Sequence, residues 1–344
     1  MKKMFAKAKP TSSIRKGVPT FEEATWVENL TIMSVDYAQK AEDYFHTLTP
    51  KLPVKTPQGR YKVFSRADAF RTEAGPRRPG AEARTRATAI AEQTYATVGQ
   101  AIKTQLADED RQAEGSMVDE RRKVNEVTRD LLLRRDLDWV SAFFGTSIWA
   151  SDISSGFTQW NAANATIIAD VREWRSLIHS LCAAEANRMA IPSDVFDVVM
   201  EDPEIIERIP NVVSTSVEDK AAIRRASIAA LEVLFEVEEI KVGKAIRNSA
   251  ADGLTASQAY IASDAILLMA VPSEGPALDV PSASYCASWS PFDNVDATVA
   301  SSGGAAISSW YEDKTKSMWF QGDMHYDFFI PDTSAGLFAS NLLA

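Results

Sequence analysis

The chain has 344 residues, of which 45% are hydrophobic and 24% are charged, with a formal net charge of -10 at pH 7. This composition is typical of an ordinary folded protein with about two domains, which excludes a predominantly disordered chain. The longest apolar run, residues 265–271, is far shorter than the roughly 20 residues that a membrane-spanning helix requires. The basic start continues into Pro10 and Thr11 without an apolar segment, so we expect no signal peptide and a cytoplasmic protein.

Positive charge is concentrated in two segments. Residues 1–16 hold six basic residues and no acid, and residues 57–92 hold eight basic residues against four acids, so the rest of the chain carries a charge of -20. Because opposite charges steer association and fix its register, basic extensions on an acidic body predict contacts between copies of the chain. Basic tails are also typical of DNA-binding proteins, although the acidic body argues against that function. A further alternative is that both segments are flexible and solvated.

The first 56 residues predict an extended arm. They contain four scattered prolines and only weak hydrophobic periodicity, with one short helix expected around residues 35–46. An arm without a core of its own needs another surface to lie on.

Residues 57–92 predict a long two-stranded loop. The stretch 59–88 has few apolar residues and two turn signals, Gly75-Pro76 and Pro79-Gly80. Since an isolated hairpin is marginal in water, either this loop is disordered or a neighbouring subunit holds it. Its arginines are our candidate contacts between subunits: Arg66, Arg71, Arg77, Arg78, Arg84 and Arg86.

The stretch 115–144 is the expected organising element, because it has no proline and no internal glycine. Its apolar residues recur largely at three- and four-residue steps, which predicts one long helix with a buried face. Six acids and six bases between residues 119 and 138, with Arg135 and Asp136 among them, predict a solvated, ion-paired opposite face. A coiled-coil arm is the alternative, but its heptad register breaks within this stretch.

A compact domain is expected after the long helix. Apolar spacing and helix caps predict helices over residues 167–181, 193–198, 203–209 and 216–234, and short strands over residues 237–242 and 265–271. Near the end, seven of the 31 aromatic residues lie between residues 310 and 329. The charged turn 312–316 and Gly322-Asp323 divide them, which predicts an antiparallel meander packed against the long helix.

Motifs for catalysis or cofactor binding are missing from the sequence. It contains no phosphate-binding loop and no Gly-x-Gly-x-x-Gly. No two of its three histidines have a metal-ligand spacing, and we expect Cys182 and Cys286 to be reduced packing residues. We therefore expect no enzyme, cofactor or metal site. A soluble hydrolase using scattered carboxylates is a remote alternative.

The order of these segments resembles the major capsid proteins of tailed bacteriophages with the Hong Kong 97-type fold. The resemblance covers most of the chain from Gly59 onward, and the order of its motifs is the specific part. Stretches that carry it include Arg78-Pro79-Gly80-Ala81-Glu82, Ile206-Glu207-Arg208-Ile209, Ile240-Lys241-Val242-Gly243-Lys244-Ala245 and Tyr326-Asp327-Phe328.

The resemblance implies an α+β fold, the Hong Kong 97-type capsid fold, with the following parts. They are an N-terminal arm (1–56), an extended loop (57–92), a peripheral domain (93–148 and 301–344) with the spine helix 115–144 and an antiparallel sheet, and an axial domain (149–300). No catalytic residues carry over.

The resemblance also implies a structural protein that self-assembles into hexamers and pentamers of an icosahedral phage head around packaged double-stranded DNA. Such a protein belongs to the virion capsid and assembles in the host cytoplasm. Expected partners are scaffold, portal and decoration proteins, with DNA contacted non-specifically and no membrane. The basic start lacks the long charged helix of a fused scaffold, so we expect a separate scaffold or none. An encapsulin-like compartment shell is the alternative within the same fold.

Overall fold

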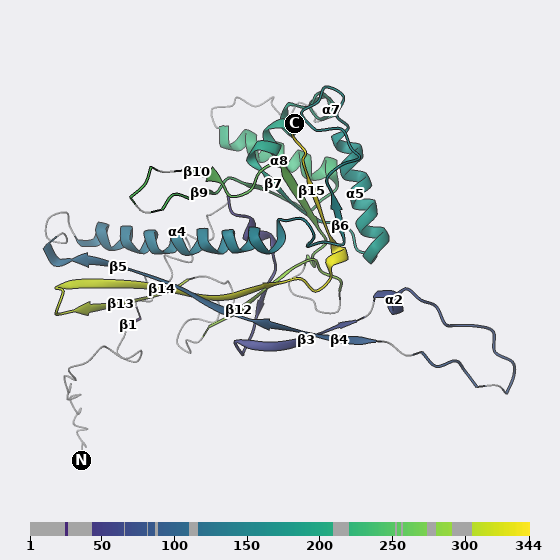
Figure 1. Cartoon of the computed structure of the whole chain (residues 1–344), viewed down its shortest axis with the longest axis horizontal. Coiled ribbons are helices and arrows are strands. Elements are labelled where there is room, and N and C mark those ends of the chain that lie inside the picture. The colour runs from purple at the N-terminus through teal and green to yellow at the C-terminus, as the bar shows by residue number, and fades with distance from the viewer. Residues whose placement is uncertain are drawn as a thin grey trace, which may run out of the picture.

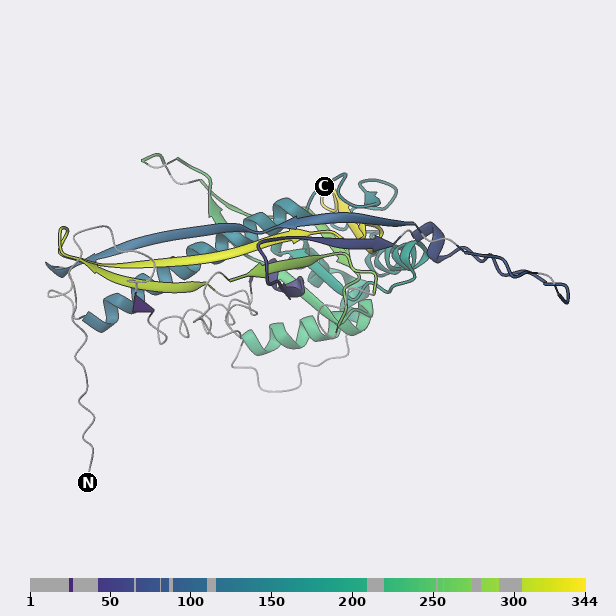
Figure 2. The same cartoon turned by 90° about the horizontal axis from the view of Figure 1, so that it is seen from below.

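The described part of the chain forms two large β-sheets joined by one long helix, together with two two-stranded hairpins (Figures 1 and 2). The structure is a computed structural model, and it describes residues 25–26, 43–64, 66–80, 82–86, 89–109, 116–208, 220–251, 253–255, 257–273, 280–290 and 305–344. Most of the predicted arm and most of the helix predicted at 35–46 lie outside these residues. The described end of that region forms a short 3-10 helix, η2 (Phe45–Leu48).

The first sheet is long and narrow and is organised around its longest strand, β14. Its strands are β1 (Thr25–Trp26), β2 (Lys51–Pro53), β5 (Val98–Ala107), β12 (Tyr285–Trp289), β13 (Ala306–Glu312) and β14 (Ser317–Phe329). β5 pairs antiparallel with one edge of β14, while β13 and then β12 pair antiparallel with its other edge. The indole rings of Trp310 and Trp319, directly opposite each other, stack with centroids 6.4 Å apart. Such cross-strand aromatic pairs stabilise a sheet.

The predicted aromatic meander is confirmed at its charged turn and wrong at its second break. β13 ends at Glu312 and β14 begins at Ser317, but β14 then continues through Gly322-Asp323 without a turn. A Cβ atom on Gly322 would lie 2.6 Å from Cγ1 of Val127 and 2.7 Å from Cδ1 of Leu131. This glycine therefore serves the close approach of the long helix to the sheet.

The long helix is confirmed as α4 (Ser116–Phe143), which lies along the first sheet (Figure 1). Its first half buries apolar side chains against β14 and β5: Val124, Val127, Leu131 and Leu132. The ion pairs Lys123–Glu126 and Arg134–Asp138 confirm a solvated opposite face. Arg135 and Asp136 do not belong to that face, because both are fully buried.

The second sheet is the centre of the larger core. Its order is β6-β15-β11-β7-β8. The strands are β6 (Ser151–Ile153), β7 (Arg188–Pro192), β8 (Glu239–Gly243), β11 (Ala265–Met269) and β15 (Gly336–Ser340). The strands predicted over residues 237–242 and 265–271 are thus confirmed as β8 and β11.

All four helices predicted around this sheet are present. They are α5 (Ile167–Cys182), α6 (Ser193–Glu201), α7 (Pro203–Arg208) and α8 (Lys220–Phe235). α5 buries the apolar face that its spacing predicts, and the Asp202 carboxylate caps α7 by accepting a hydrogen bond from the N–H of Ile205 at 3.1 Å. Cys182 and Cys286 are buried, and neither forms a disulfide in the described structure, as expected.

The two sheets divide the chain differently from the predicted domain boundaries at two places. β12, which falls within the predicted axial domain, is a strand of the long sheet, and β15, near the chain's end, is a strand of the second sheet.

Among the described residues, no helix combines the length and apolar character needed to cross a membrane.

Gly322→Ala should lower the free energy of unfolding by roughly 1–3 kcal/mol, because its methyl group forces α4 away from β14. Gly75→Ala is the matched control, since its methyl group would meet only the flexible guanidinium of Arg84, at 3.2 Å, and the change should stay within about 0.5 kcal/mol. Urea titration of the unassembled subunit measures both, and equal stabilities of the two variants would contradict the close contact.

Candidate assembly interface

The root of the extended loop is a β-hairpin fixed to the first sheet of its own chain. β3 (Gln58–Phe64) and β4 (Ile90–Ala96) pair antiparallel. The ring of Phe329 in β14 packs against those of Tyr61 and Tyr95, with centroids 4.7 and 6.3 Å apart, and the N–H of Ala96 donates to the Asp327 carboxylate at 2.9 Å. The expectation that this hairpin is either disordered or held by a neighbouring subunit is therefore wrong for its root.

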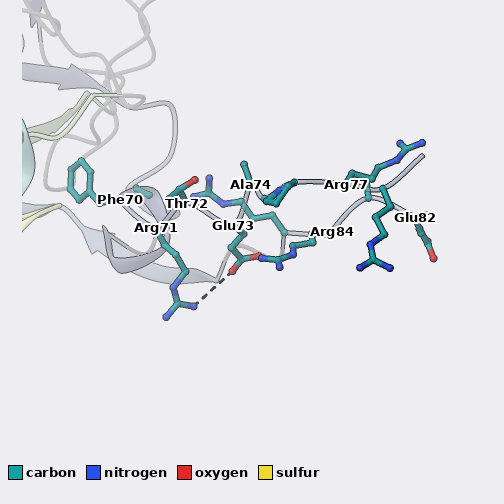
Figure 3. A pocket seen from close by; sticks show the side chains of 14 residues that line it. Phe70, Arg71, Thr72, Glu73, Ala74, Arg77, Glu82 and Arg84 are labelled. Atoms are coloured by element: carbon teal, nitrogen blue, oxygen red, sulfur yellow. Dashed lines mark ion pairs between the residues drawn. The ribbon is translucent and has the colours of Figure 1, made fainter. Parts of the chain in front are cut away.

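Beyond the root, the loop projects far from the body of the molecule (Figures 1 and 2). Among the described residues of the loop, only 58–64 and 90–96 form a strand ladder, so the expectation that the ladder continues towards the two turns is wrong for this part of the chain. A short helix, α2 (Arg66–Ala69), begins the projecting part, and the described residues after it are extended and mostly exposed. Its two legs enclose an open hollow of about 910 Å³ (Figure 3).

The candidate arginines lie along this projecting part. Arg66 begins α2, the Arg71 guanidinium lies 3.9 Å from the Glu73 carboxylate, and Arg86 donates to the main-chain carbonyl of Asp68. Within the described residues, Arg77, Arg78 and Arg84 have neither a hydrogen bond nor an ion pair (Figure 3). Exposed guanidinium groups of this kind can bind carboxylates or phosphates of another molecule, with two parallel hydrogen bonds each.

The aromatic contact that holds the loop's root could not be predicted from the sequence. Tyr61, Tyr95 and Phe329 come from three strands that are distant in the chain. The alternation of Tyr61 with Lys62 and Val63 is compatible with a strand, but it does not say what the tyrosine faces.

A buried polar joint connects the long helix to η2. The Oδ1 atom of Asp136 accepts a hydrogen bond from the backbone N–H of His46 at 2.9 Å and lies 3.3 Å from its Nδ1. Nearby, the indole N–H of Trp139 donates to the Thr49 hydroxyl at 2.7 Å, and the Arg135 guanidinium donates to Sγ of Cys286 at 3.3 Å. These side chains have almost no solvent exposure, so they stabilise the attachment of η2 to α4 and cannot contact a substrate.

Burial dominates the electrostatics of this joint. It raises the pKa of the Asp136 carboxyl to about 7, although the hydrogen bond from the His46 N–H partly opposes the shift. It also lowers the pKa of the His46 imidazole well below its usual value, and the neighbouring positive charge of Arg135 acts in the same direction.

The described residues contain no group of three or more His, Cys, Asp or Glu side chains that could hold a metal ion.

These features define a recognisable class of fold: a long helix along a narrow sheet, a second compact sheet domain, and a loop that projects from the end of the molecule. Solved structures with this arrangement include phage capsids, and the chain has the phage major capsid fold of the Hong Kong 97 type. No protein-family model matches the sequence, and no curated protein does either.

Three solved structures illustrate the likeness. A phage-related protein from Bordetella bronchiseptica RB50 matches with a TM-score of 0.66 and 20% identity, over 93% of this chain and 98% of that one. The capsid of cyanophage P-SCSP1u gives a TM-score of 0.54 at 10% identity, over 96% and 92% of the two chains. The holo-SrpI encapsulin complex of Synechococcus elongatus PCC 7942 gives 0.50 at 9% identity, also over 96% and 92%. At these identities the likeness establishes the fold.

Asp136→Asn should make the protein less sensitive to pH between about pH 4 and pH 7. The folded chain keeps a proton on Asp136 that the unfolded chain releases near pH 4, so this group's contribution to stability falls as pH rises through that range. The variant should therefore gain roughly 1–3 kcal/mol in free energy of unfolding relative to the wild type across the window.

Urea titrations of both proteins across this pH range measure the difference. Asp136→Ala is the companion variant, and relative to Asp136→Asn it should be destabilised by about 1–2 kcal/mol throughout, because the His46 N–H loses its acceptor. Parallel pH profiles for the wild type and Asp136→Asn would contradict the raised pKa.

Proposed function

We propose that this chain is a structural major capsid protein that self-assembles into hexamers and pentamers of an icosahedral phage head enclosing double-stranded DNA. The observation that carries the proposal is the projecting basic loop, whose Arg77, Arg78 and Arg84 lack partners in the described part of their own chain. A loop of this kind needs another copy to lie on, and the capsid fold supports that use of it. In this role the protein is not an enzyme.

In the proposed capsid protein, each of the two large sheets belongs to a different domain. The long sheet and α4 form the peripheral domain, and the second sheet with α5 to α8 forms the axial domain that meets its copies around local symmetry axes. The loop overlaps the next subunit, together with the N-terminal arm. The candidate inter-subunit contacts remain Arg66, Arg71, Arg77, Arg78, Arg84 and Arg86.

Charge supports assembly between copies. The loop segment carries +4, whereas residues 149–273 contain 18 acids and 10 bases. Opposite charges of this size favour an encounter of the loop of one copy with the second domain of another. The further partners that this role implies are scaffold, portal and decoration proteins, and the basic residues 1–16 are suited to non-specific contact with packaged DNA. The protein would assemble in the host cytoplasm and remain in the virion capsid.

An encapsulin-like compartment shell is the second candidate, because the SrpI encapsulin shares the fold over nearly the whole chain. The two kinds of particle differ in what they enclose. Particles purified from expressing cells would hold a cargo enzyme in one case, and would take up DNA together with the packaging proteins in the other.

Purified protein should form closed particles in a manner that depends on salt and on protein concentration, since exposed opposite charges are screened by ions. Light scattering over a salt series, followed by negative-stain electron microscopy, measures this. A chain that stays monomeric at every salt and protein concentration would refute the shell function.

Reversal of two loop charges, Arg77→Glu with Arg78→Glu, should lower the assembled fraction roughly tenfold by replacing attraction with repulsion. The circular dichroism of the subunit should not change, because both side chains are exposed and unpaired in the described structure. Lys314→Glu with Lys316→Glu is the matched control, since it changes the same charge in the exposed turn between β13 and β14. Equal assembly of both double variants would show that the contact lies elsewhere.

A further inference from the structure

A second projection leaves the molecule from the other domain. It is the hairpin 246–260, formed by β9 (Ile246–Asn248) and β10 (Gln258–Tyr260) between β8 and β11 of the second sheet. Its strands pair only with each other among the described strands, and every residue in them is exposed. In both views the hairpin points away from the extended loop, towards the opposite end of the molecule (Figures 1 and 2).

The hairpin presents large apolar side chains to solvent. Ile246 and Tyr260 lie directly opposite each other, hence on one face of the hairpin, and each is 50% exposed; Leu254 at the tip is 71% exposed. A two-stranded hairpin with no covering layer is marginally stable, and grouped exposed apolar residues are typical of a binding surface.

The hairpin is nevertheless built to hold its shape. The Oδ1 atom of Asn248 accepts hydrogen bonds from the N–H groups of Ala250 at 3.1 Å and Ser257 at 2.9 Å. At its foot, the N–H of Ile261 donates to the carbonyl of Ala245 at 3.1 Å. A preformed hairpin loses little conformational entropy when its apolar residues become buried against a partner.

The extended loop offers an apolar surface where its root meets its projecting part. Phe70 is 59% exposed and Ile90 is 51% exposed. They belong to the two legs of the loop, which are tied together where the N–H of Ala89 donates to the Asp68 carboxylate at 2.9 Å. Phe70 appears in Figure 3 at the end of the loop nearest the body.

We propose that the hairpin 246–260 of one subunit packs on the extended loop of the next, at the junction of the root and the projecting part. Leu254, Ile246 and Tyr260 of the hairpin would cover Phe70 and Ile90 of the loop. The occupant is a second copy of this chain, because the two apolar surfaces project from one molecule in opposite directions and cannot meet within it. A contact between two different surfaces of identical subunits repeats head to tail and can close into a ring. The opposite charges of the loop and the second domain favour the same pairing.

This inference rests on the proposed shell function, and cysteine cross-linking tests it. Leu254→Cys and Phe70→Cys are made on separate copies, one of them carrying a size tag, and are assembled together before treatment with a short bis-maleimide. The native Cys182 and Cys286 are buried and should not react. A cross-linked pair of one tagged and one untagged chain is expected only in the mixture.

Cross-links between two Leu254→Cys copies, or none at all in well-formed particles, would overturn the proposed contact while leaving the shell function intact. Failure of the wild type to form particles under any condition would instead count against the shell function itself. The two outcomes are therefore distinguishable.

A second measurement does not depend on cross-linking. Leu254→Ser should lower the assembled fraction about tenfold, since a leucine side chain loses its burial. Thr255→Ser is the matched control: Thr255 is exposed next to Leu254 on the same hairpin, and its replacement removes only one methyl group, so it should leave assembly unchanged. Equal loss of assembly in both variants would refute a specific role for the Leu254 side chain.

Discussion

The sharing of one helix by two hydrophobic cores determines the shape of this protein. The first half of α4 packs on the long sheet, whereas Trp139 and Phe143 at its other end belong to the core of the second sheet. η2 fastens the helix from the side, since Phe45 and Leu48 are fully buried in that second core and His46 binds Asp136. Apolar burial of this extent is the dominant stabilising term in folding, so both cores depend on the helix staying in place.

The same arrangement explains why the basic loop and the hairpin lack support. Among the described residues, neither core contains a side chain from the projecting part of the loop or from the hairpin 246–260. The loop is attached at its root by the Tyr61, Tyr95 and Phe329 rings, and beyond them it has only local contacts. In the proposed shell, neighbouring subunits would support these segments.

Much of this fold could be predicted from the sequence, because periodicity is a local property. The long helix and the helices around the second sheet follow from apolar spacing and capping residues. The failures involve contacts between distant residues. Asp136 looks solvated among alternating charges, but its partner His46 lies 90 residues away, and Gly322 resembles a turn glycine until the helix it faces is known. The loop arginines could be found, but partners for Arg77, Arg78 and Arg84 could not, because the described part of the chain contains none.

One consequence of the long helix concerns how motion would pass through the molecule. α4 runs for 28 residues, about 42 Å, without the proline or glycine that usually allows a helix to kink. It therefore behaves as a rigid rod, and its two ends pack in the hydrophobic cores of the two sheets. A tilt imposed on one sheet is passed along α4 to the other sheet, so in the proposed shell the loop and the hairpin 246–260 would have to adapt to differences in curvature.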